Sequence, residues 1–189
     1  MKKRLDNTAL WNEAAVAGML FGAVSIGCLL GKEAAALSGS TVLITLVGFV
    51  LWAAEFFGCI ALMRKRMIHL RDNYEGVTIA QSHSFGRRAA LLSGLLLASA
   101  QALIIMKMPP ETMDTMVGQV ASQMQLSSSD LDSVGRVIDK LPLWTFLFQW
   151  GYCFLYGTVL SSIMSRYVFI QGLFDAANQQ QDRQEPDEQ

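Results

Sequence analysis

Hydrophobic residues along this chain gather into four long blocks separated by polar stretches, at about residues 9–31, 41–63, 86–106 and 143–165. Each block is close to the roughly 20 apolar residues that a helix needs to cross a hydrocarbon core of about 30 Å. Backbone groups in lipid must satisfy their own hydrogen bonds, so these blocks should be helices. The short alternating pattern of a membrane barrel is not seen. We therefore predict an all-α protein, an integral membrane four-helix bundle.

Basic residues flank the blocks unevenly. The start of the chain and the stretch between the second and third blocks hold most of them, namely Lys2, Lys3, Arg4, Arg64, Lys65, Arg66, Arg71, Arg87 and Arg88. Lys32 stands alone in the first connection, and the long connection before the fourth block mixes both signs. Because cytoplasmic loops carry an excess of Lys and Arg, both termini should be cytoplasmic (N-in/C-in). A bacterial inner membrane is the natural setting for this multi-pass topology.

A cleaved signal peptide is the competing interpretation of the first block. Its basic start fits one, and Ser25-Ile26-Gly27-Cys28 is similar to a lipoprotein cleavage site. However, the usual leucine is missing, and Asp6 and Glu13 are unusual in a signal. We expect an uncleaved first helix. The three cysteines all fall inside the blocks, so no disulfide framework is implied.

Small residues four positions apart recur on three of the predicted spans. Inside lipid such rows let two helix backbones approach closely. The helix-packing positions that we expect are Gly18, Gly22, Gly94 and Gly157. Packing within the bundle is the simpler interpretation, and self-association is the alternative.

Glu55 is the deepest ionisable residue in the predicted spans. It lies eight positions before Met63, so it sits roughly 12 Å in from the predicted cytoplasmic end. A carboxylate there is stable if protonated or if it meets a cation, for which we expect Arg88 or Arg166. A structural contact with a neighbouring helix is the favoured interpretation, and a proton or cation relay is the alternative.

Three further polar residues lie in the spans. Glu13 is nearer the cytoplasmic end of the first span and could assist a relay or reach the interface. Gln101 and Gln149 lie toward the periplasmic side, where either could bridge helices through hydrogen bonds.

The long connection, residues 109–142, predicts a periplasmic amphipathic helical hairpin between the third and fourth transmembrane helices. Prolines bound it, and apolar residues recur at helical spacing on two stripes. These apolar positions include Met113, Met116, Val120, Met124, Leu131, Val134 and Ile138. The hairpin should lie on the membrane, fold over the bundle or dock on a partner. A soft-metal site at the methionines is a minor alternative, because methionine also serves as flexible core filler.

Local sequence signals also predict the start of the third helix and the state of the C-terminal tail. Thr78 and Gln81 fit a capping box, so the third helix should begin before its apolar block does. Residues 178–189 are rich in Gln, Asp and Glu without an apolar pattern, which predicts a disordered cytoplasmic tail after a single domain of residues 1–177. The basic residues are those that the topology requires, so nucleic-acid binding is not expected.

The chain is poorly equipped for enzyme chemistry. It has no nucleophile elbow, zincin helix or phosphate loop, and its histidines and acids show no metal-ligand spacing. We expect no catalytic residues, no cofactor and no bound metal.

The order of features from His69 onward resembles a family of small four-helix membrane proteins, found mostly in Bacteroidota, named domain of unknown function 4199. The matching elements are Leu70-Arg71-Asp72, Gly76-Val77-Thr78-Ile79, the Pro-led Met-rich segment, Leu126-Ser127 with Ser129-Asp130, and Gly157. The sequence departs from the family at Pro109-Pro110, where an Asp-Pro is common. The resemblance implies no agreed activity or catalytic residues. Because members are often encoded near a polyprenol-phosphate glycosyltransferase, it implies an accessory role in envelope glycan or lipid-linked sugar metabolism.

We therefore predict a non-enzymatic accessory or scaffold membrane protein. Its partners would be the lipid bilayer and either a second copy, as a homo-oligomer, or another membrane protein. The alternative is a small oligomeric transporter or channel that uses Glu55 as a proton or cation relay.

Overall fold

The computed structural model describes residues 3–109, 111–113, 115, 118 and 140–184. Within them the chain consists of long helices, two short strands and the turns and short segments that connect them. The elements are β1 (Lys3–Arg4), α1 (Asn7–Ala36), α2 (Thr41–Asn73), β2 (Tyr74–Glu75), α3 (Ile79–Met106) and α6 (Leu141–Gln184). In this described part, four helices are long and apolar enough to cross a membrane. The predicted all-helical class is thereby confirmed, and the orientation remains a prediction.

The helix starts follow local capping chemistry. The Asp6 side chain accepts a hydrogen bond from the backbone N–H of Ala9 at 2.6 Å and begins α1. Thr78 and Gln81 form the predicted capping box at the start of α3, each side chain bonding the other's backbone N–H. This prediction is confirmed, and α3 begins seven residues before the predicted span at residue 86.

All four helices run beyond the apolar blocks, and α2 and α6 do so furthest. We predicted that α2 would end near Met63 and that its basic residues would lie in a loop, but the helix continues to Asn73. Arg, Lys, Met and Leu are good helix formers, and no glycine or proline interrupts them before Gly76, which has a positive φ of 65°. We also predicted disorder from residue 178, but α6 continues to Gln184. Its Ala and Gln residues extend a helix that is already nucleated. Residues 185–189 lie outside the described residues.

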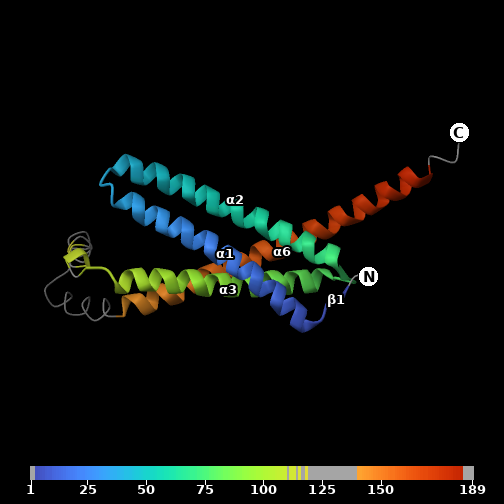
Figure 1. The fold of residues 1–189 in the computed structure, drawn as a ribbon, viewed down its shortest axis with the longest axis horizontal. Helices are drawn as coiled ribbons and strands as arrows, with labels where there is room; N and C mark the ends of the chain where they lie inside the picture. The colour runs from blue at the N-terminus through green and yellow to red at the C-terminus, as the bar shows by residue number, and fades with distance from the viewer. Residues whose placement is uncertain (1–2, 110, 114, 116–117, 119–139, 185–189) are drawn as a thin grey trace.

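The helices form two pairs that meet at one end. Figure 1 shows α3 lying along α6, α2 lying along α1, and α1 crossing α3. We call the end that carries β1, β2 and the start of α3 the packed end. We call the opposite end, with the α1–α2 turn, the open end. There the turn lies away from the ends of α3 and α6 (Figure 1).

The buried core occupies the packed end. Its residues come from all four helices and from the segment before α1: Leu5, Leu10, Ala14, Ala17, Phe21, Met63, Met67, Leu70, Phe85, Ala89, Leu160 and Val168. β1 also pairs in parallel with β2, with Lys3 opposite Tyr74 and Arg4 opposite Glu75. Toward the open end the large apolar side chains are exposed instead, among them Leu37 and Val42. The two helix pairs are therefore fastened at the packed end.

Glycines set the close helix contacts that fix this arrangement. A Cβ atom at Gly18 would lie 2.8 Å from the Leu92 side chain, and one at Gly22 would lie equally close to Leu96, so α1 approaches α3 there. A Cβ at Gly94 would lie 2.9 Å from Cys153, and one at Gly157 would overlap Ala90. Close approach of small residues is a typical way for helices to associate in lipid.

Candidate functional site

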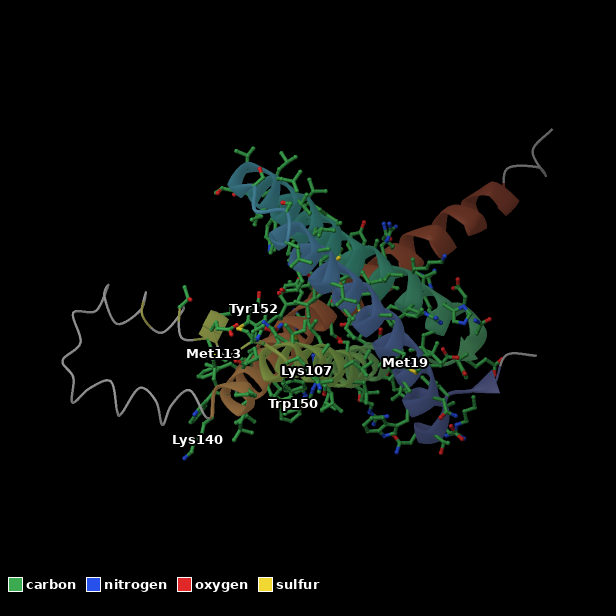
Figure 2. The ribbon with its side chains drawn as sticks, turned by 60° about the vertical axis from the view of Figure 1, so that its left-hand side comes forward. Met19, Lys107, Met113, Lys140, Trp150 and Tyr152 are labelled. Carbon is green, nitrogen blue, oxygen red and sulfur yellow. The ribbon has the colours of Figure 1, made fainter. Side chains whose placement is uncertain are left out.

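A cavity of about 350 Å³ lies between the α1–α2 pair and the α3–α6 pair. All four helices contribute to its lining. Figure 2 shows that Trp150 and Tyr152 leave α6 in different directions. The Trp150 indole donates a hydrogen bond to the Leu91 carbonyl of α3, whereas Tyr152 lines the cavity. Cavities of this size are typical of small-molecule sites in proteins.

Glu55 lies on the cavity wall and is paired with a cation from the neighbouring helix. Its carboxylate is 3.4 Å from the Lys32 ammonium, and the two side chains are 24% and 37% exposed. We expected Arg88 or Arg166 as the partner, and this was wrong. Arg88 instead lies over the Trp11 ring, 4.5 Å from its centroid, and Arg166 is exposed.

We expected the wrong partner for Glu55 because we misplaced Lys32. We placed this residue in the first connection, but three alanines extend α1 to Ala36, so Lys32 lies within the helix. Because its side chain is long, the ammonium reaches the carboxylate of α2. The structural interpretation of Glu55, a contact with a neighbouring helix, fits this geometry.

The other predicted polar candidates lie in different places. Glu13 is at the packed end, where it accepts a hydrogen bond of 3.2 Å from the Tyr74 hydroxyl. Burial and the nearby Glu13 carboxylate raise the pKa of Tyr74. Gln101 is half-buried on α3 and is not among the cavity-lining residues. The structure therefore does not bring Glu13 or Gln101 to Glu55.

Gln149 does line the cavity. From the sequence it could bridge two helices, but in the described part of the chain its amide donates to the Cys153 sulfur, 3.5 Å away on the same helix. Residues four positions apart share a helix face, which accounts for this local contact.

An aromatic row forms much of the cavity wall, and sequence reasoning missed it. Trp52 stacks on Phe56 with ring centroids 5.7 Å apart, Phe56 contacts Tyr156 at 6.1 Å, and Tyr156 stacks on Tyr152 at 6.3 Å. The row thus runs from α2 to α6. The four-residue spacing of Trp52 and Phe56 in α2 and of Tyr152 and Tyr156 in α6 was a signal that could have indicated its two halves.

Cysteine side chains also belong to the cavity wall. Cys59 and Cys153 line the cavity, and Cys28 is buried nearby on α1. Across the described ranges, no group of three or more His, Cys, Asp or Glu residues could hold a metal ion. All three cysteines are free thiols.

Most of the predicted hairpin lies outside the described residues. Of the apolar positions predicted for it, Met113 is described: its backbone N–H donates to the Pro109 carbonyl at 3.2 Å and its side chain is half-buried. The positions outside the described residues are Met116, Val120, Met124, Leu131, Val134 and Ile138.

The described part of the chain is thus a helical protein with four helices that are long and apolar enough to cross a membrane. Comparisons of the chain with protein-family models, curated proteins and solved structures found no match.

Proposed function

We propose that this chain is a non-enzymatic accessory or scaffold membrane protein that binds a second copy of itself or another membrane protein through α2. The observation that carries the proposal is the exposure of this helix. None of the most apolar 18-residue stretch of α2 is buried within the chain. Its bulky side chains, such as Phe49 at 67% and Phe57 at 65%, are largely exposed.

Small residues on α2 support a protein partner on this face. A Cβ atom at Gly58 would have no atom within 4 Å, as is also the case at Gly27 and Gly151. Ala54 and Ala61 are exposed at helical spacing on the same side. Positions that let backbones approach are typical of helix–helix contacts in lipid. On this face of α2, the described helices of the chain leave these positions free for such a contact.

Site-specific photo-crosslinking tests this role. A benzophenone amino acid at Phe57 should give a discrete adduct, at twice the chain mass for a second copy or at another defined mass for a different protein. The matched control is Phe148 on α6, which is 72% exposed and should give none. Gly58→Leu should abolish the adduct, whereas Gly151→Leu should leave it, because Gly151 also meets no atom within 4 Å. If Phe57 and Phe148 behave alike, the proposal is lost.

The location we propose is the bacterial inner membrane, with the packed end in the cytoplasm. The support is the distribution of cations. Arg64, Lys65 and Arg66 follow the apolar part of α2, and Arg87 and Arg88 lie in the first part of α3. The open end carries fewer of them, including Lys107 and Lys140. The predicted hairpin, residues 109–142, would then lie on the periplasmic side, with its last two residues in α6.

The process we propose is envelope glycan or polyprenol-phosphate sugar metabolism. Its support is the resemblance to domain of unknown function 4199. Lipid-linked sugars extracted from a deletion strain would test it, with an altered pool expected and an unchanged pool contradicting it.

A small oligomeric transporter or channel is the second candidate, because the cavity reaches Glu55 within the apolar part of the bundle. Reconstituted protein should then pass protons or cations. A Glu55→Gln variant that keeps the same flux would remove this candidate.

A further inference from the structure

The cavity combines one carboxylate with an aromatic wall. Among the described residues that line it, Glu55 is the acid and Lys32 is the basic residue. Trp52, Phe56 and Tyr152 belong to the aromatic row beside them. Aromatic faces attract cations through the ring quadrupole, most strongly where water is excluded. A carboxylate in the same apolar site attracts a cation further, because the low dielectric screens it little.

Lys32 occupies the position that a cationic ligand would take. Its ammonium already contacts Glu55, but at 3.4 Å the pair is long for a charge-assisted hydrogen bond. Lys32 lies four residues before the end of α1, about 6 Å along the helix axis. A lysine this close to a helix end can extend its ammonium to the membrane interface. Glu55 lies 14 residues inside α2, so its carboxylate is too far from the helix end to reach the interface in the same way.

We propose that the cavity binds a hydrophobic organic cation, such as a quaternary or protonated amine with an apolar body. The ligand's charge would replace the Lys32 ammonium at Glu55, and its apolar body would pack on Trp52, Phe56 and Tyr152. Lys32 thus acts as an internal competitor that fills the site when no ligand is bound. The proposal does not rest on partner binding, which uses the outer face of α2 at Gly58.

An anionic amphiphile fits the same cavity less well. It would have to compete with the Glu55 carboxylate for Lys32 and would gain nothing from the aromatic faces, whose quadrupole repels negative charge. The two ligand classes therefore predict opposite effects of the same substitutions.

Binding of tritiated tetraphenylphosphonium to the full chain in lipid nanodiscs tests this. Wild-type protein should bind it saturably, and the isosteric tetraphenylborate anion should not compete beyond its partition into lipid. Glu55→Gln should weaken binding about tenfold or more, as expected for the loss of a charged partner. This variant should stay folded, because Lys32 can reach the interface. The matched control Glu33→Gln, at an exposed acid on α1, should bind normally.

Two further comparisons test whether the cavity prefers a cation. Lys32→Met should tighten binding because it removes the competitor, and the double variant Lys32→Met/Glu55→Gln should bind as weakly as Glu55→Gln. Trp52→Ala should weaken binding several-fold, as for the loss of one cation–π contact, whereas Trp144→Ala, at an exposed tryptophan outside the cavity lining, should not. Equal affinity of wild type and Glu55→Gln, weaker binding by a folded Lys32→Met, or competition by tetraphenylborate would each overturn the proposal.

Discussion

The Lys32 ammonium lies 3.4 Å from a carboxylate oxygen of Glu55, so an ion pair joins α1 to α2 along the wall of the central cavity. The pair lies between the buried core and the open end, where few apolar contacts hold α2 to the rest of the bundle. It therefore joins the helix that we propose as the partner-binding element to the helix that packs on α3.

The Lys32–Glu55 ion pair should make a modest but measurable contribution to the free energy of unfolding. Polar contacts between helices in membranes are worth roughly 0.6 kcal/mol on average. We expect Glu55→Gln and Lys32→Met each to lower the free energy of unfolding, and the double variant to lose less than their sum. A double-mutant cycle by steric trapping or detergent titration would measure this. Strictly additive losses would show that the pair does not couple the helices.

Gly157 should tolerate no larger side chain. A Cβ atom there would overlap Ala90 of α3, so Gly157→Leu should lower the free energy of unfolding by about 1–3 kcal/mol, as overpacking does. Gly151→Leu, on the same helix, should be nearly neutral because nothing lies within 4 Å of its Cβ position. Thermal unfolding in detergent compares the two. Equal losses would contradict the close contact of α3 and α6.

The contact between Tyr74 and Glu13 should make the free energy of unfolding depend on pH in the alkaline range. Burial and Glu13 raise the pKa of Tyr74 in the folded state, so the unfolded chain loses this proton first as the pH rises past about 10. Its contribution is therefore complete below that pH and is lost above it. We expect wild type to exceed Tyr74→Phe by about 1 kcal/mol at pH 8, the value of one hydrogen bond. The difference should shrink toward pH 11, and a constant difference would count against the Tyr74–Glu13 contact.

The sequence predicts the helices better than it predicts what they contact. Long apolar blocks predict helices directly, because lipid leaves the backbone no other way to pair its polar groups. The Thr78 capping box is equally local and was found at the right residues. Helix ends were harder, since the charged residues after Met63 mark the end of an apolar block and not the end of a helix.

The candidate site could be predicted only in part. The depth of Glu55 follows from its position in an apolar block, but its partner depends on how α1 and α2 are aligned. That alignment brings Lys32 within reach, whereas residues nearer in the expected topology, such as Arg88, contact other groups. The aromatic row depends on α2 and α6 together, so neither block predicts it alone.

The central claim is that this protein crosses a membrane four times with its packed end in the cytoplasm, and cysteine accessibility tests it most directly. In a background lacking Cys28, Cys59 and Cys153, single cysteines would be placed at Ser38, Glu75 and Ser128. A membrane-impermeant maleimide added to cells with a permeabilised outer membrane should label Ser38→Cys and Ser128→Cys. It should label Glu75→Cys only in inverted inner-membrane vesicles. Labelling of Glu75→Cys from outside, or protection of Ser38→Cys there, would contradict the account.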